Sequence, residues 1–129
     1  METKFSSIKK TSSTQEVAER FHELAHQERW FEIQDELFAD DVRSIEPAYS
    51  SYFKNEEGKQ KVRRKGEDWV KRIAAVHNRY TTDPLIAGNH FVVGTQVDIT
   101  VEGFGRIKID ELMLYQVKDG QIVLEQFFY

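Results

Sequence analysis

Residues 89–129, NHFVVGTQVDITVEGFGRIKIDELMLYQVKDGQIVLEQFFY, decide the fold of this chain. Apolar and polar residues alternate over residues 89–101, which is typical of a half-buried strand. The apolar face of this strand consists of Phe91, Val93, Val97, Ile99 and Val101. Glycine-containing turns at residues 102–105 and 118–120 connect it to two further strands, residues 106–117 and 121–129. The sequence therefore predicts a meander of three long antiparallel strands.

The second and third strands carry large apolar side chains on both faces. In the second strand, for example, Leu112 and Leu114 oppose Met113 and Tyr115. A sheet that is apolar on both faces needs a cover on each. We expect helices on one face and a second copy of the chain on the other, so the predicted partner is a homodimer through the sheet. The residues predicted at that interface are Met113, Tyr115, Leu124 and Phe128.

Composition limits the class of protein. The chain has 129 residues, of which 40% are hydrophobic, so it can form one domain, predicted over residues 14–129 after a loose arm at 1–13. A net charge of −4 gives no electrostatic case for a nucleic-acid partner, and no apolar stretch is long enough to span a membrane. The absence of cysteine excludes disulfides and thiolate metal sites. The arm lacks the apolar core of a secretion signal, so a cytoplasmic protein is expected.

Three helices are predicted before the meander. Ser13 and Glu16 form a capping-box pattern that opens a helix over residues 14–27. A second short helix ends at residues 39–41, and a strand follows at 42–46, ended by Pro47. Residues 48–65 are long for a connector and are interpreted as either a mobile flap or a partly ordered excursion, with the basic tract at 59–65 as a solvated loop. The third helix begins at Gly66 and continues to about Tyr80, which places His77 on its apolar face.

This order of elements predicts an α+β fold in which helices pack into a bent sheet. It resembles the NTF2-like (cystatin-like) superfamily, and within it the SnoaL-like polyketide cyclase and ketosteroid isomerase branch. The resemblance extends over residues 14–129. It rests on residues 37–41 (LFADD), on Glu46-Pro47, on Gly66 at a helix start, on Asp110 and on the hairpin at residues 118–123. It implies a cone of three helices in a strongly bent antiparallel sheet, and no cofactor.

The resemblance also implies roles for single residues. Glu46 falls where the isomerases place the carboxylate base that moves a proton beside a carbonyl. Asp110 falls where they keep a protonated carboxyl that donates a hydrogen bond to the developing enolate oxygen. The isomerases' oxyanion-binding tyrosine has no match, since Phe21 or His22 stands there. The cyclases' aspartate in the last strand is replaced by Phe127.

Alternatives remain for both carboxyls. Glu46 can instead end a strand and pair with Arg43 or with an arginine of the 63–64 run. If the other face of the second meander strand lines the cavity, Glu111 takes the place of Asp110. An Asp110 that faces bulk water would remove the mechanism built on it and favour a non-catalytic binding module. An open cavity that reaches both carboxyls would favour chemistry.

A second motif indicates another class of protein. Residues 22–26, His-Glu-Leu-Ala-His, match the pattern in which two histidines one helical turn apart bind zinc and the glutamate acts as general base. Both histidines, however, project away from the apolar stripe of the helix. A surface histidine pair without metal is therefore predicted, and a zinc hydrolase is the remote alternative.

The predicted function is binding of a small hydrophobic molecule, with a cofactor-independent isomerase, cyclase or dehydratase as its enzymatic form. A ligand-binding or protein-interaction module of the same fold is the alternative. Glu46 and Asp110 are the candidate catalytic residues. The candidate ligand-binding residues are Phe91, Val93, Ile99, Leu112, Glu125, Phe127, Tyr129 and, by its place on the third helix, His77.

Overall fold

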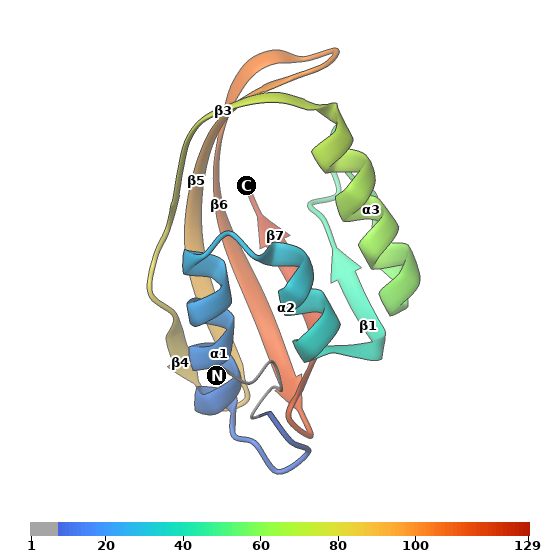
Figure 1. Ribbon diagram of the computed structural model, residues 1–129. Helices are drawn as coiled ribbons and strands as arrows, with labels where there is room; N and C mark the ends of the chain where they lie inside the picture. Colours follow the sequence, from blue (N-terminus) through green and yellow to red (C-terminus); the bar gives the residue numbers. More distant parts are fainter. Residues whose placement is uncertain (1–7) are drawn as a thin grey trace, which may run out of the picture.

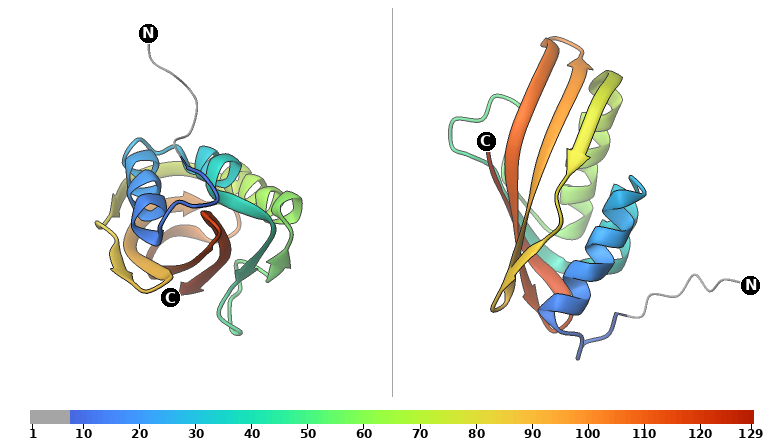
Figure 2. Two further views of the ribbon diagram at one scale, coloured as in Figure 1. Left: turned by 90° about the horizontal axis from the view of Figure 1, so that it is seen from below. Right: turned by 90° about the vertical axis from the view of Figure 1, so that its left-hand side faces the viewer.

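The computed structural model describes residues 8–129, and in it three helices lie against one side of a strongly curved sheet (Figure 1). The helices are α1 (Thr14–His26), α2 (Trp30–Leu37) and α3 (Lys59–Arg72). The strands are β1 (Phe38–Ile45), β2 (Glu56–Glu57), β3 (Ile73–Thr81), β4 (Leu85–Ala87), β5 (His90–Val101), β6 (Gly105–Lys118) and β7 (Gln121–Phe128). Figure 2 shows the sheet curling beneath the helices. The predicted α+β fold class and the three-stranded meander are confirmed.

The strands follow the order β2-β1-β7-β6-β5-β3, and β4 also pairs with β5. Every pair is antiparallel except β1 with β7, which run parallel. A wholly antiparallel sheet was expected, so this pair is a difference from the prediction. Their register aligns Ser44 with Glu125 and Ile45 with Gln126. The end of β1 therefore lies beside the end of β7, and Glu46 comes close to Tyr129.

Helix α1 forms as predicted. The Ser13 side chain accepts a hydrogen bond from the Glu16 N–H (3.1 Å), and the Glu16 carboxylate accepts one from the Ser13 N–H (2.8 Å). The apolar stripe of the helix is buried, and its Phe21 ring lies 5.3 Å from that of Phe91 and 4.7 Å from that of Tyr115. The core is therefore centred between α1 and the inner faces of β5 and β6.

The next boundary differs from the prediction. Strand β1 begins at Phe38, directly after α2, so Asp40 and Asp41 lie in a strand rather than in a helix end. Phe38 and Val42 are buried, and the Gly58 N–H donates to the Val42 carbonyl (2.8 Å). Tertiary contacts of the apolar residues thus outweigh the local preference of the two aspartates.

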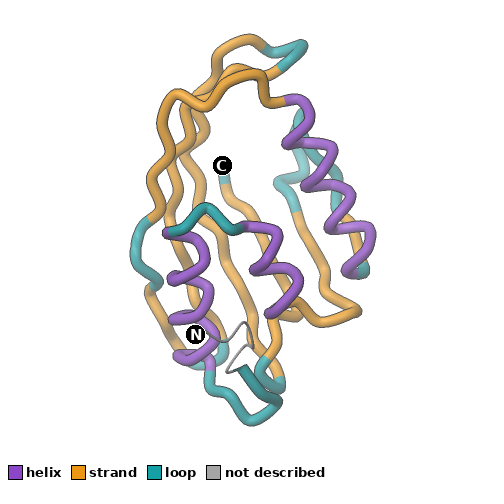
Figure 3. Tube along the Cα trace, viewed as in Figure 1, coloured by secondary structure: helices purple, strands orange, loops and turns teal. Residues whose placement is uncertain are grey.

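The basic tract is helical, which corrects its interpretation as a solvated loop. Helix α3 starts at Lys59, and Gly58 opens it with a positive φ of 94°. Arg63 lies over the Phe31 ring (4.6 Å) and donates to the Phe31 carbonyl (3.1 Å). A Cβ at Gly66 would lie 3.1 Å from Phe31, so glycine permits the close approach of α3 to α2. Figure 3 shows the helix in purple beside the teal loop that precedes it.

The third helix also ends earlier than predicted. Residues 73–81 form β3, which pairs with β5, and most of its side chains are exposed. His77 is exposed on this strand, and its Nε2 lies 2.7 Å from the Thr100 hydroxyl. It is therefore neither a core histidine nor a cavity residue, and its predicted role in ligand binding is wrong.

Part of the predicted N-terminal arm is packed against the domain. Ile8 contacts the core, and a Cβ at Gly120 would lie 1.8 Å from the Lys9 carbonyl oxygen. Residues 8–13 are therefore not a loose segment, while residues 1–7 of the predicted arm lie outside the described residues. Across residues 8–129, no helix is both long and apolar enough to cross a membrane.

Candidate functional site

The register of the β5–β6 hairpin decides which carboxyl reaches the interior. Thr95 pairs with Glu111, and Gln96 pairs with Asp110. Thr95 is buried and Glu111 partly buried, whereas Gln96 and Asp110 are exposed. The prediction that Asp110 lines the cavity is wrong, because β6 turns its odd-numbered residues inward. Glu111 takes its place.

The same register corrects other expectations. Leu112 is 52% exposed on the outer face, so it is not a cavity wall. Met113 and Tyr115 are buried inside, so they do not belong to the outer face that was predicted to bind a second copy. Phe91 and Val93 are buried in the packed core around Phe21 rather than at the cavity surface.

Two hollows that share Phe53, Trp69 and Glu111 in their linings lie between the sheet and helices α2 and α3. The first, here called the apolar lobe, has a volume of about 150 Å³. Its other residues include Trp30, Arg79, Val97, Ile99, Ile109 and Tyr129. The second, the acidic lobe, has a volume of about 190 Å³. Its other residues include Gln34, Glu46, Val62, Lys65, Glu125 and Phe127.

Glu46 is held in the acidic lobe by two donors. The Lys65 ammonium donates to Oε2 (2.8 Å), and the Tyr129 hydroxyl donates to Oε1 (2.7 Å). Ser50 Oγ lies 2.6 Å from the same hydroxyl. The side chains of Glu46 and Lys65 are only 3% and 12% exposed. This geometry fixes the orientation of the Glu46 carboxylate at the cavity.

A second carboxyl joins this network through Ser44. Lys65 Nζ also lies 2.7 Å from Ser44 Oγ, and the Ser44 hydroxyl donates to Glu125 Oε2 (2.7 Å). A β-bulge between Gln116 and Val117 in the β6–β7 pairing changes the register, and Glu125 is buried together with Ile122. Lys65 is thus the cation shared by a chain of groups from Glu46 to Glu125.

Burial keeps two of the three carboxyls protonated up to about neutral pH. Burial first, and then the negative charges of Glu46 and Glu125, raise the pKa of Glu111 to about 8 against the opposing charge of Arg79. Burial also raises the pKa of Glu125 to about 7, opposed by the Ser44 hydrogen bond and the Lys65 charge. Glu111 is therefore mostly a neutral acid at pH 7, which can donate a hydrogen bond.

Two polar atoms at the cavity have unused hydrogen-bonding capacity. Gln34 Oε1 in the acidic lobe and Arg79 Nε in the apolar lobe are buried, and neither has a hydrogen-bond partner among residues 8–129. Buried polar groups in folded proteins are nearly always satisfied. A ligand that satisfied both atoms would bring one donor and one acceptor, and the two side chains would have to turn to meet it, because both atoms are buried.

Lys65 was not predicted as the partner of Glu46; Arg43 and the 63–64 arginines were proposed instead. The sequence contained a signal for it, because Val62, Lys65 and Trp69 follow helical spacing and share one face once a helix begins at residue 59. The spacing was not recognised because the tract was interpreted as a loop. Gln34 and Arg79 carried no sequence signal of their own.

Comparison with known proteins identifies the family. A SnoaL-like domain matches residues 12–129. The structure of a proposed SnoaL-like polyketide cyclase (carbohydrate phosphatase) from Mesorhizobium loti is 30% identical and has a TM-score of 0.85, with 92% of this chain and 100% of that chain covered. A search of curated protein sequences finds no significant match.

Two more distant structures share the fold. An NTF2-like protein from Burkholderia thailandensis has a TM-score of 0.76 at 11% identity, covering 92% of this chain and 91% of its own. A protein of unknown function with a cystatin-like fold from Xanthomonas campestris has a TM-score of 0.71 at 15% identity, covering 91% and 90%. These two likenesses show the fold alone. The domain match over residues 12–129 and the 30% identical structure establish that the chain belongs to the SnoaL-like family.

Proposed function

We propose that this protein binds a small hydrophobic molecule with a carbonyl group in the two-lobed cavity and moves a proton next to that carbonyl without a cofactor. The observation that carries the proposal is that two carboxyls in different environments line one cavity. Glu46 is bound to a lysine, whereas Glu111 is kept neutral by burial. A base and a neutral donor in one site are what proton transfer beside a carbonyl requires.

The chemistry assigns one task to each group. Glu46 takes a proton from the carbon next to the carbonyl, and the electrons of the broken C–H bond move onto the carbonyl oxygen. Glu111 donates a hydrogen bond to this developing enolate oxygen. Lys65 and Tyr129 orient the base through the hydrogen bonds at 2.8 and 2.7 Å. Return of the proton to a different carbon completes an isomerisation.

The exposure of Asp110 removes the mechanism built on that residue and, by the criterion given in the sequence analysis, favours binding without chemistry. The proposed proton transfer therefore stands on Glu111 alone as the donor. The second candidate function is binding without chemistry. It is favoured by the unpartnered Gln34 Oε1 and Arg79 Nε, since these atoms can bind a ligand that undergoes no reaction. The two candidates differ in whether a bound ketone exchanges its protons.

Replacing Glu46 with Gln should abolish most of the proton transfer. We use 2-tetralone, a bicyclic aromatic ketone, in D₂O and follow loss of its α-proton signals by ¹H NMR. The wild type should accelerate this exchange over the buffer rate, and Glu46→Gln should lower the acceleration by at least ~10²-fold, because the amide cannot accept the proton.

Glu57→Gln provides the matched control, since Glu57 is an exposed glutamate on β2. Its exchange rate should equal that of the wild type. Native mass spectrometry measures binding of the ketone separately. Binding without exchange in the wild type would establish the binding module, and neither binding nor exchange would reject the cavity as a site for such ketones.

We also propose that the outer face of the sheet binds a second copy of the chain. Tyr80, Leu112 and Phe128 are 59%, 52% and 47% exposed there, and Leu112 pairs directly with Phe128. Sedimentation velocity at micromolar concentration should show a dimer, whose stable interface would bury at least about 1,000 Å². Leu112→Arg should yield a monomer, whereas Val70→Arg, at an exposed position on α3, should not. A monomeric wild type would contradict the proposal.

A further inference from the structure

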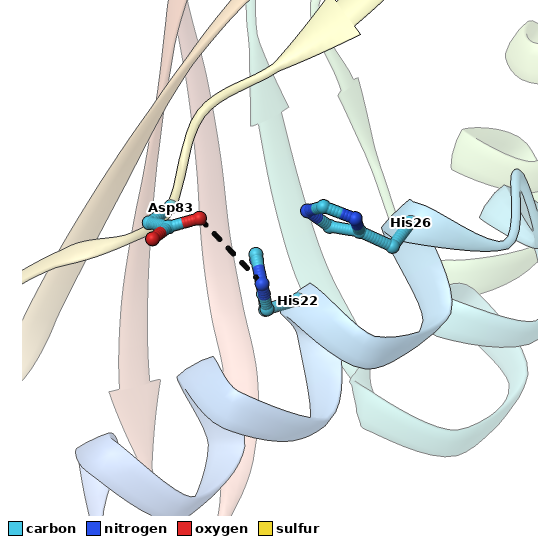
Figure 4. A group of neighbouring side chains, drawn as sticks. All are labelled: His22, His26 and Asp83. Atoms are coloured by element: carbon cyan, nitrogen blue, oxygen red, sulfur yellow. Dashed lines mark ion pairs between the residues drawn. The ribbon is translucent and has the colours of Figure 1, made fainter.

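We propose that His22, His26 and Asp83 form a binding site for a divalent transition-metal ion such as Zn²⁺, outside the cavity and independent of its function. Figure 4 shows the two imidazoles of α1 and the Asp83 carboxylate, which comes from the segment between β3 and β4, turned toward one another. One ligand atom of each residue lies within 4.8 Å of the others. The site joins the first helix to the sheet.

The helix supplies the first two ligands in a favourable arrangement. His22 and His26 are four residues apart, so they project from the same side of α1 one turn apart. Their ring centroids are 4.1 Å apart. In a tetrahedral zinc site with bonds of about 2.0–2.2 Å, neighbouring ligand atoms lie roughly 3.4 Å apart. Small rotations of these side chains therefore suffice to enclose an ion.

Asp83 supplies the third ligand, which the sequence could not reveal. Its Oδ1 lies 3.6 Å from His22 Nε2, which is too long for a hydrogen bond but close to the separation of two atoms that share a metal ion. The carboxylate is 87% exposed and free to adjust. The sequence predicted a surface histidine pair without metal because both histidines project away from the apolar stripe, and the structure brings the Asp83 carboxylate to that pair.

His22 is the more buried of the two histidines. Its side chain is 32% exposed, and its Nδ1 is buried without a hydrogen-bond partner among the described residues. Its Nε2 is the ring nitrogen that faces Asp83. A metal ion between Nε2 and the Asp83 carboxylate would replace their 3.6 Å ion-pair contact with two direct bonds.

The donor set selects the class of ion. Two imidazole nitrogens and one carboxylate suit Zn²⁺ and neighbouring transition metals, whereas Ca²⁺ and Mg²⁺ prefer oxygen ligands alone. The motif's glutamate, Glu23, is engaged by Arg20 on the helix surface, and neither histidine lines the two-lobed cavity. The arrangement thus supports metal binding but not the zinc hydrolase that the motif alone indicated.

Isothermal titration of the full chain, without a histidine tag, with ZnSO₄ at pH 7.5 tests the proposal. We expect one Zn²⁺ per chain with a Kd in the micromolar range or below, and no heat from CaCl₂. His26→Ala and Asp83→Asn should each weaken binding by roughly 10-fold or more. At zinc concentrations of about a hundred times the Kd, the Tm should rise by roughly 5 °C or more.

His77→Ala is the matched control, since it removes an exposed histidine from β3 and should leave the Kd unchanged. Unchanged binding in Asp83→Asn would overturn the three-ligand site and leave an adventitious histidine pair. Loss of binding in His77→Ala, or a wild-type Kd above about 100 μM, would also overturn it. His26 and Asp83 are both exposed, so their variants should fold, and far-UV circular dichroism verifies this.

Discussion

Replacing Lys65 with Met should lower the free energy of unfolding by about 3–5 kcal/mol, because the substitution leaves the Glu46 carboxylate buried without its cation. Lys65 and Glu46 are nearly inaccessible and their charged atoms lie 2.8 Å apart. Lys65 also contacts Ser44, and its ammonium lies 5.6 Å from the Phe127 ring centroid. Urea unfolding at pH 7.5 measures the change.

A double variant separates loss of the ion pair from loss of packing. Lys65→Met combined with Glu46→Gln removes both charges, so it should recover a large part of the lost stability. Lys61→Met controls for the loss of a lysine on the same helix, since Lys61 is exposed, and should cost less than about 0.5 kcal/mol. A single Lys65→Met variant as stable as Lys61→Met would show that the pair is not a buried ion pair in solution.

The inward position of Glu111 depends on the length of the turn between β5 and β6, which is shorter in the structure than the turn predicted at residues 102–105. The apolar face of β5 consists of odd-numbered residues, and the hairpin pairs Val101 with Gly105. In an antiparallel pair the two residue numbers have a constant sum, here even, so odd residues of β5 face odd residues of β6. The length of the turn therefore selects Glu111. The choice of Asp110 followed the family resemblance instead, and β6 offered no correction, because both of its faces carry large apolar residues.

The boundary between α3 and β3 had no comparable signal. Residues 69–80 place apolar side chains at spacings that fit either a helix or a strand, and strand β3 buries few of them: Val76 and Tyr80 are 57% and 59% exposed. Only the pairing of β3 with β5, some twenty residues later in the sequence, makes residues 73–81 a strand rather than a continuation of the helix. Long-range pairing of this kind overrides local preference, and a single sequence does not reveal it.

The parallel pairing of β1 with β7 explains why the site could be predicted only in part. Glu46 and Tyr129 were each predicted as site residues, but from separate arguments and without a contact between them. The sheet order places β1 beside the last strand, and this brings the Tyr129 hydroxyl to the Glu46 carboxylate. The pattern of residues within β1 or β7 does not predict that the two strands are neighbours, because their pairing results from the closure of the whole sheet.

The second large effect is a loss of stability as pH rises from about 5 to about 8. Burial raises the pKa of Glu111 to about 8 and that of Glu125 to about 7, from an ordinary value of 4.5. Between pH 4.5 and these raised pKa values the folded chain binds more protons than the unfolded chain, so the free energy of unfolding decreases with rising pH. The stabilisation is complete below about pH 4.5 and is lost once pH passes the folded pKa values. Each group contributes a slope of about 1.4 kcal/mol per pH unit while it is protonated only in the folded state.

Glu111→Gln isolates the contribution of one group, because the amide resembles the neutral acid and does not titrate. The difference in stability between Glu111→Gln and the wild type should shift in favour of the variant by about 1.4 kcal/mol per unit from pH 5.5 to 7.5, as measured by urea unfolding. Asp110→Asn, the exposed neighbour, should keep the wild-type slope. If the free energy of unfolding of Glu111→Gln and of the wild type changed equally with pH, Glu111 would be ionised throughout this range. It could then not donate a hydrogen bond to an enolate at pH 7, so the same titration also tests the proposed mechanism at its donor.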